Sequence, residues 1–281
     1  MTRFVTSSDG LRLAYDDVGT GPPVLCLSGL TRTMSDFDAV QARFSDVARI
    51  LRMDYRGRGA SDFAPDETTY TIPQEAEDAL TLLDHLGLDR AAVLGTSRGG
   101  LIAMHLAQVA PHRLSGVLLN DIGPDIAPEG IAAIMGYLGR PPSYRSHAEA
   151  AAGLAEALAP AFQNVSPAQW RAHAERLFRA TGEGLALRYD PKLRDAVINT
   201  GATGAVPTLW PSFDALAKLR PLGLIRGANS DLLHRDTAAE MCARAPHMRF
   251  AEIPDRGHVP FLDEPAAVEA IAKFLSDLPS T

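Results

Sequence analysis

The sequence of 281 residues has little cysteine and no long apolar run. Only Cys26, in an apolar strand-like stretch, and Cys242, in a helical pattern, are present. Their spacing matches neither a disulfide framework nor a metal site. We therefore expect two buried, reduced thiols and no metal.

Signals for a membrane, for export and for an excess of positive charge are also missing. No apolar run approaches the roughly 18 residues of a membrane span, and residues 1–10 lack the apolar core of a signal peptide. A formal net charge of -7 disfavours nucleic acid and anionic membrane surfaces as partners. We expect a cytoplasmic protein with neither kind of partner, and no pattern indicates its oligomeric state.

What is present is an alternation of short apolar runs with helical patterns, typical of an α/β fold. The chain opens with a hairpin signal, Ser8-Asp9-Gly10, between two strand-like stretches. The alternation predicts a mostly parallel sheet with helices on both faces and the hairpin at one edge. The expected later strands are 24–27, 48–53, 91–94, 114–119, 222–226 and 248–253, and the expected helices are 37–44, 73–86, 100–110, 236–244 and 265–275.

The alternation breaks between residues 121 and 210, which are rich in alanine and punctuated by proline. Helical patterns cover 129–138, 147–158 and 167–180, and no strand is expected there. A segment of this length is too long for a plain loop. We interpret 121–210 as a helical cap inserted into a core made of 1–120 and 211–281.

The pentapeptide from Gly95 to Gly99, Gly-Thr-Ser-Arg-Gly, lies between an apolar strand and a helical pattern. Gly-x-Ser-x-Gly in that position is typical of a nucleophile elbow, a turn sharp enough to strain its serine. The flanking glycines are needed because side chains there would collide. Ser97 is the candidate nucleophile.

A serine hydroxyl needs a general base within hydrogen-bond reach. His258 is the best candidate, because it lies between the last strand and the last helix, at the carboxyl edge of the sheet where ligands gather. His234 is the only rival by location. The other six histidines lie in ordinary helix or loop contexts.

The base needs a carboxylate that fixes its tautomer. Asp231 follows the strand 222–226 and gives the chain order serine, acid, histidine expected of this fold, so we predict Asp231 as the acid. Asp121, directly after the strand 114–119, is one alternative. Asp236 is another, although it is typical of a helix start.

An oxyanion needs preorganised donors. We expect the backbone N–H groups of Leu30 and Arg98, with Gly29 allowing close approach. Both side chains are then free to contact substrate. Trp210 and Phe261, and also Trp170, are candidates to line a substrate pocket, and plain packing is an equally good interpretation of each.

The blocks 54–61, 95–100 and 257–260 resemble three blocks of the α/β-hydrolase fold superfamily, and the likeness runs over residues 11–275 with its weakest part in the cap. The charged, glycine-containing segment 54–62 is interpreted as structural. Ser28-Gly29 stands where many members have His-Gly. Arg98 replaces the usual apolar or amide residue, which suggests that its side chain favours an acidic substrate or pairs with a cap carboxylate.

The resemblance implies a serine hydrolase that cleaves small-molecule carboxylic esters or lactones through an acyl-enzyme, without metal or organic cofactor. Two alternatives stay open. A carbon–carbon bond hydrolase acting on a ring-cleavage product keeps the same three residues. A non-enzymatic ligand receptor on the same fold is the other.

Overall fold

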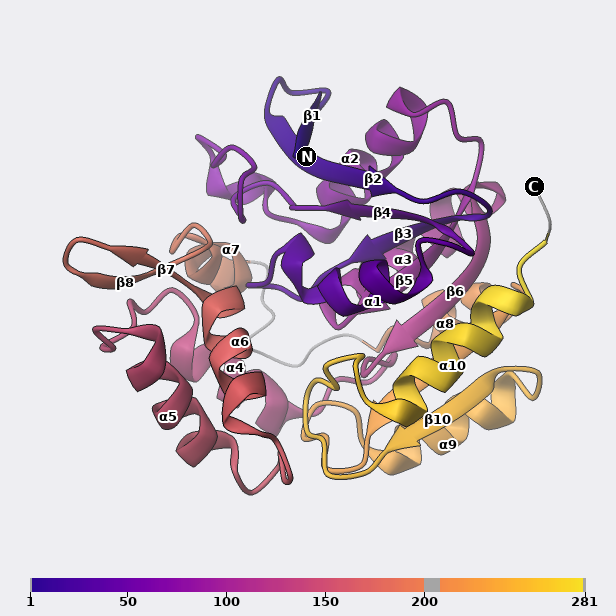
Figure 1. Ribbon diagram of the computed structural model, residues 1–281. Coiled ribbons are helices and arrows are strands. Elements are labelled where there is room, and N and C mark those ends of the chain that lie inside the picture. The colour runs from indigo at the N-terminus through magenta and orange to yellow at the C-terminus, as the bar shows by residue number, and fades with distance from the viewer. Residues whose placement is uncertain (1, 200–207, 280–281) are drawn as a thin grey trace.

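The computed structural model describes residues 2–199 and 208–279. Its centre is an eight-stranded sheet in the order β1-β2-β4-β3-β5-β6-β9-β10 (Figure 1). β1 pairs antiparallel with β2 and β2 with β4, and the remaining neighbours are parallel. The expected parallel sheet with an N-terminal hairpin at one edge is confirmed. The strands are β1 Arg3–Thr6, β2 Arg12–Val18, β3 Pro23–Leu27, β4 Arg49–Met53, β5 Ala91–Thr96, β6 Leu114–Asn120, β9 Leu222–Gly227 and β10 Arg249–Ile253.

Helices cover both faces of this sheet because its central strands are apolar on both sides. Every residue of β3, β5 and β9 is buried. One apolar cluster joins the sheet to α2, α3, α8 and α9, and a second joins it to α1 and α10. The bounds of these helices are α1 Asp38–Phe44, α2 Ile72–His85, α3 Arg98–Val109, α8 Trp210–Leu216, α9 Arg235–Arg244 and α10 Pro265–Ser276.

Local signals set the ends of these helices. At α2, the Thr71 hydroxyl accepts a hydrogen bond from Gln74 N, and Gly87 follows the helix with a φ of 67°. The predicted boundaries of α2, α9 and α10 therefore lie within a residue or two of the observed ones. Three short 3₁₀ turns complete the core: η1 Met34–Phe37, η2 Glu67–Thr69 and η3 Pro111–Arg113.

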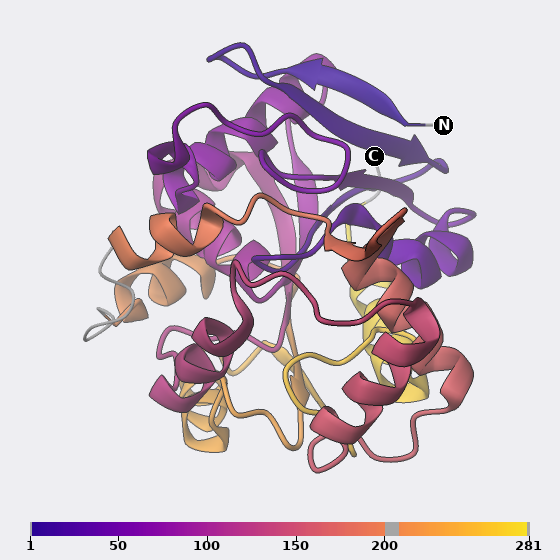
Figure 2. The same cartoon turned by 90° about the vertical axis from the view of Figure 1, so that its left-hand side faces the viewer.

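Between β6 and α8 the chain forms a further layer, which faces the viewer in Figure 2. The expectation of no strand there is wrong, because β7 and β8 form an antiparallel hairpin. α6 ends three residues early since Phe178 already has extended backbone, and Gly184 closes the hairpin turn with a φ of 132°. The division of the chain at residues 121 and 210 stays a prediction. The elements are α4 Pro128–Tyr137, α5 His147–Leu158, α6 Pro167–Leu177, β7 Phe178–Thr181, β8 Gly184–Leu187 and α7 Leu193–Asn199.

Two general expectations can be compared with the structure. Among the described residues, no helix has the length and apolar character that crossing a bilayer requires. Cys26 is buried and Cys242 is half-buried, and both are free thiols. The expected burial therefore holds for Cys26 only.

Candidate active site

Ser97 stands at the sharp turn between β5 and α3, with φ 50° and ψ -112°. A Cβ at Gly95 would lie 2.7 Å from the backbone of Gly99, and one at Gly99 would lie 2.0 Å from the carbonyl oxygen of Leu27. Neither position has room for a side chain. The predicted strained turn is confirmed, and its strain is typical of functional positions.

His258 lies beside this serine, on the loop between β10 and α10. Its Nε2 is 3.0 Å from Ser97 Oγ, and its Nδ1 is 2.8 Å from Asp121 Oδ2. The side chain of Asp121 is fully buried, and that of His258 is 14% exposed. A hydroxyl, an imidazole and a buried carboxylate thus form one hydrogen-bonded chain, the arrangement that activates a serine.

The acid in this chain is not the predicted one. Asp231 is exposed, four residues beyond the end of β9, while Asp121 follows β6 directly. β6 lies next to β5, so the first residue after β6 reaches the same edge as Ser97. The structure therefore corrects the expectation for Asp231 in favour of the alternative, Asp121.

The turn after β9 nevertheless donates two hydrogen bonds to Asp121. Asp121 Oδ1 accepts from Gly227 N at 2.8 Å, and Asp121 Oδ2 accepts from Ser230 Oγ at 2.6 Å. These two hydrogen bonds hold the orientation of the carboxylate. The rival histidine, His234, contacts α4 instead, where its Nε2 lies 2.6 Å from Glu129 Oε1.

The two backbone amides predicted for an oxyanion hole are those of Leu30, which follows Gly29, and Arg98, which follows the serine. Within residues 2–199 and 208–279, neither amide donates to another group of the protein. A Cβ at Gly29 would lie 3.8 Å from the Cβ of Ser97 and 3.1 Å from the Cγ of Arg32. This arrangement suits two free donors close to the nucleophile, and their role stays a prediction.

The side chain of Arg98 pairs with a carboxylate of the core. Its Nε donates to Glu75 Oε2 at 2.5 Å, and its Nη2 donates to the carbonyl oxygen of Tyr70 at 3.0 Å. Glu75 belongs to the core helix α2, so the expected pairing of Arg98 with a cap carboxylate is wrong. The expectation that Arg98 favours an acidic substrate stays a prediction.

Glu75 connects the two loops that carry the candidate amides. Its other oxygen accepts from Arg58 Nη1 at 2.7 Å, and Arg58 Nε donates to the carbonyl oxygen of Leu30 at 2.9 Å. Burial opposes the charge of Glu75, but the positive charges of Arg58 and Arg98 hold its pKa below the usual range. One buried carboxylate thus fixes both sides of the predicted oxyanion hole.

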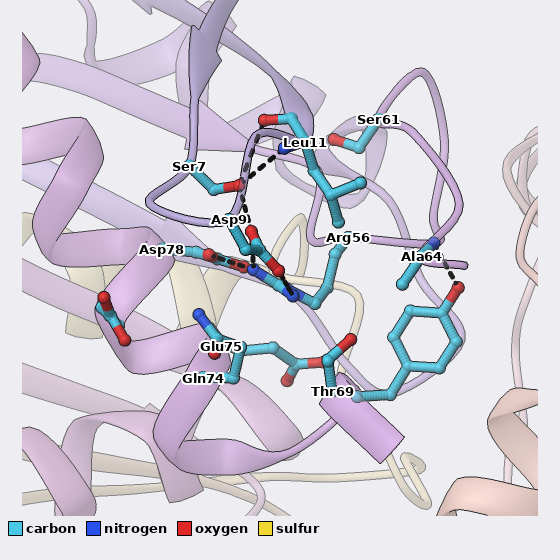
Figure 3. A network of polar contacts seen from close by, with 12 residues as sticks. Ser7, Asp9, Leu11, Arg56, Ser61, Ala64, Thr69, Gln74, Glu75 and Asp78 are labelled. Carbon is cyan, nitrogen blue, oxygen red and sulfur yellow. Dashed lines mark hydrogen bonds and ion pairs between the residues drawn. The ribbon is translucent and has the colours of Figure 1, made fainter. Parts of the chain in front are cut away.

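The rest of the charged segment 54–62 is structural, as expected. Arg56 is fully buried and pairs with Asp78 at 2.7 Å and Asp9 at 2.8 Å (Figure 3). Asp54 accepts hydrogen bonds from the backbone amides of Met34 and Ala60, at 2.7 and 2.9 Å. Burial nevertheless raises the pKa of Asp54 to about 6.

A small cavity of about 30 Å³ adjoins the neighbours of Ser97, Asp121 and His258 in the chain, and Phe261 lines it. Whether it is part of a substrate pocket stays a prediction. The ring of Phe261 stacks on Phe162 of the cap, with centroids 5.3 Å apart, and contacts the buried ring of Trp170 at 6.2 Å. The full lining is Arg32, Asp36, Thr96, Asn120, His173, Arg176, Val259, Pro260, Phe261 and Leu262.

Trp210 is not part of this lining, contrary to expectation. Its indole Nε1 donates to Asp125 Oδ2 at 2.7 Å, the guanidinium of Arg244 lies 4.2 Å from its ring centroid, and its ring packs edge-on against Phe213. These contacts hold α8 against its neighbours. The packing interpretation therefore applies to Trp210.

Sequence reasoning missed two lining residues, His173 and Arg176. Both belong to α6, where residues three apart share a face. That face also carries Trp170, whose ring contacts His173 at 5.9 Å. Two polar side chains on the apolar face of a cap helix were the available signal.

Comparison with known proteins shows the family to which the chain is similar. A family model described as the alpha/beta hydrolase fold matches residues 22–265. A 3-hydroxybutyrate-oligomer hydrolase of Cupriavidus necator is 38% identical over 276 residues, covering 94% of this chain and 93% of that protein. Both matches span the candidate serine, acid and histidine.

Solved structures extend the similarity. An alpha/beta hydrolase from Novosphingobium aromaticivorans superposes with a TM-score of 0.91 at 39% identity, covering 99% of this chain and 98% of that one. A thermophilic esterase from Thermogutta terrifontis, with malate bound, gives a TM-score of 0.73 at 25% identity, covering 98% of each chain.

Proposed function

Since this chain belongs to the α/β-hydrolase fold family and is a hydrolase of that fold, we propose that it is a serine hydrolase that cleaves small-molecule carboxylic esters through an acyl-enzyme. One observation carries the proposal. Ser97 Oγ, the His258 ring and the Asp121 carboxylate are connected by contacts of 3.0 and 2.8 Å. No metal or organic cofactor is required for this chemistry.

The proposed reaction follows from the order of these contacts. Ser97 Oγ attacks the ester carbonyl while His258 Nε2 takes its proton. Asp121 keeps the other ring nitrogen protonated and stabilises the imidazolium. The amides of Leu30 and Arg98 bind the oxyanion.

Collapse of the tetrahedral intermediate completes the first half-reaction. His258 gives its proton to the leaving alkoxide, and the acyl group remains on Ser97. Water, deprotonated by His258, then attacks the acyl-enzyme, and His258 returns the proton to Ser97 Oγ as the acid is released. The same steps open a lactone, whose leaving alkoxide stays attached to the acid.

The similarity to named ester hydrolases supports an ester as the substrate class. The Cupriavidus relative is named for oligomers of 3-hydroxybutyrate, which are esters of a short hydroxy acid. Small hydroxy-acid esters are accordingly our first choice of substrate. A carbon–carbon bond hydrolase and a ligand receptor remain the alternatives that the test must separate.

The test is hydrolysis of p-nitrophenyl esters of increasing acyl length by the wild type and by Ser97→Ala. We expect turnover by the wild type and a loss of at least about 10³-fold in kcat for the variant, because the covalent step is removed. The acyl-length optimum measures the pocket. Turnover that survives in Ser97→Ala, or no turnover of any ester, would contradict the proposal.

A further inference from the structure

Three nitrogen-bearing side chains converge on the small cavity next to the candidate active site. Arg32 comes from the loop after β3, and His173 and Arg176 come from the cap helix α6. The loop and the helix are far apart in the chain. The cavity is therefore built jointly by the core and the cap.

Two of these side chains lack the partners that buried polar groups normally have. Among the described residues, Arg176 Nε and His173 Nδ1 are buried and form no hydrogen bond. Arg32 differs, because its Nε and Nη2 each donate a hydrogen bond of 2.7 Å to the carboxylate of Asp36. A buried donor without an acceptor costs free energy, so its presence in a cavity indicates a missing acceptor.

The charges around the cavity leave an excess of one positive charge. Arg32 and Asp36 neutralise each other in their ion pair. Burial, together with the positive charges of Arg32 and Arg176, holds the pKa of His173 well below the usual histidine range, so its ring is neutral. The charge of Arg176 is left without a counter-charge among the residues that line the cavity, and an anion would balance it.

The size and chemistry of the cavity suit a carboxylate. A volume of about 30 Å³ has room for a small polar end group but not for a whole substrate. Guanidinium groups bind the planar carboxylate through paired hydrogen bonds. The imidazole of His173 adds a third donor through whichever ring nitrogen is protonated.

The cavity is close to the reacting atoms. Its lining includes Thr96, Asn120 and Pro260, which are one or two residues from Ser97, Asp121 and His258 along the chain. Gly29 lies between the stem of Arg32 and the nucleophile, since a Cβ on that glycine would contact both side chains. A carboxylate held there lies a few bonds from an ester carbonyl placed at Ser97.

We propose that Arg176 and His173, with Arg32 at the edge, form a subsite for a free carboxylate of the substrate. This proposal rests on the ester hydrolase function. It makes the substrate class an ester that also carries a carboxylate, such as an acid-ended oligomer of a short hydroxy acid. Neutral esters should react without this anchor and therefore less efficiently.

The test compares Arg176→Gln with a matched control, Arg171→Gln. Arg171 belongs to the same helix but is exposed and pairs with Glu175 on the helix surface. The substrates are 3-acetoxybutyrate, with its carboxylate on the alcohol side, and monoethyl succinate, with its carboxylate on the acyl side. Their neutral counterparts are the methyl ester of 3-acetoxybutyrate and diethyl succinate, respectively. The value of kcat/KM is measured for all four substrates.

We expect Arg176→Gln to lower kcat/KM for one carboxylate ester about 10- to 100-fold, the usual loss for a charged hydrogen-bond partner. For the neutral esters the loss should stay within about threefold, and Arg176→Lys should recover part of the activity on the carboxylate ester. Arg171→Gln should change kcat/KM for neither the carboxylate esters nor the neutral esters. The carboxylate ester that loses more identifies the side on which the subsite lies. Equal losses on charged and neutral esters would overturn the proposal.

A binding measurement separates failure of the subsite from failure of the proposed function. Ser97→Ala is titrated with butyrate and with butyramide by calorimetry, with and without Arg176→Gln. The subsite predicts that butyrate binds more tightly and that Arg176→Gln removes the difference, whether or not any ester is hydrolysed. Equal binding of acid and amide would overturn the subsite while leaving ester hydrolysis to its own test. Thermal unfolding of each variant shows that the fold is retained.

Discussion

At the scale of single residues, the assignment of the acid matters most. Asp121 and Asp231 both follow parallel strands of the same sheet, and the chain order serine, acid, histidine is satisfied by either. Only the positions in space distinguish them. Asp121 is buried and touches the imidazole, whereas Asp231 faces solvent.

We predict that Asp121→Asn lowers kcat on a p-nitrophenyl ester by about 10³- to 10⁴-fold, because an amide favours the wrong histidine tautomer. The matched change Asp231→Asn should alter kcat less than about threefold, since that side chain reaches no catalytic group. Steady-state kinetics of the two purified variants checks this. The reverse order of effects would restore Asp231 as the acid.

At the scale of elements, α2 contacts the residues around the candidate active site through a buried carboxylate. Glu75 binds Arg58, which holds the carbonyl of Leu30, and also binds the side chain of Arg98. Asp78, one turn further along the same helix, binds Arg56 instead. Two buried carboxylates on one helix therefore differ in whether their arginine partners contact the residues beside the serine.

This difference predicts separate effects on stability and on activity. Glu75→Gln should lower the free energy of unfolding by about 3–5 kcal/mol, because it leaves the buried guanidinium of Arg58 uncompensated. Asp78→Asn should lower it by less, because Arg56 keeps its ion pair with Asp9. Only Glu75→Gln should also lower kcat of the folded enzyme, by about 10- to 100-fold, through misplaced oxyanion donors. Denaturant titration and kinetics at a temperature where both are folded test this. Equal kcat values in the two variants would count against the bridging role.

Much of the element structure could be predicted because its signals are local. Thr71 and Gly87 define the ends of α2, and the buried strands are continuous apolar runs. The hairpin of β7 and β8 escaped prediction because most of its residues are exposed or half-buried and it extends directly from α6. The sequence predicts Asp121 only as an alternative, because both aspartates follow parallel strands and their distances from His258 depend on how the loops fold in space. His173 and Arg176 depend on how the cap lies over the core, which no local pattern specifies.

At the scale of the whole molecule, the buried charges of segment 54–62 affect how stability depends on pH. The pKa of Asp54 is raised to about 6 in the folded protein, against about 4 for an unfolded aspartate. Between these values the folded protein keeps a proton that the unfolded chain has lost. The contribution of Asp54 to stability is thus complete below about pH 4 and is lost as pH rises through 6.

We predict that the free energy of unfolding of the wild type, measured relative to Asp54→Asn, falls by about 2–3 kcal/mol between pH 4 and pH 7. Asparagine does not titrate, so the difference removes the contributions of all other groups and the constant cost of an altered hydrogen bond. Urea titrations of both proteins across this range give the value. A difference that stays constant with pH, or that rises, would contradict the raised pKa.

The burial of Asp121 between β6 and the turn after β9 also determines which positions near the site tolerate replacement. Gly227 gives its amide to that carboxylate, and a side chain there would lie 2.5 Å from the carbonyl oxygen of Arg256. Ser230 gives its hydroxyl to the same carboxylate. We expect these two positions to be constrained, while position 231, which is exposed and, among the described residues, forms no hydrogen bond with His258, should tolerate changes in charge and size. A search for relatives of the same mechanism should therefore look for an aspartate after β6 and a glycine and a serine after β9, and should not require an acid at position 231.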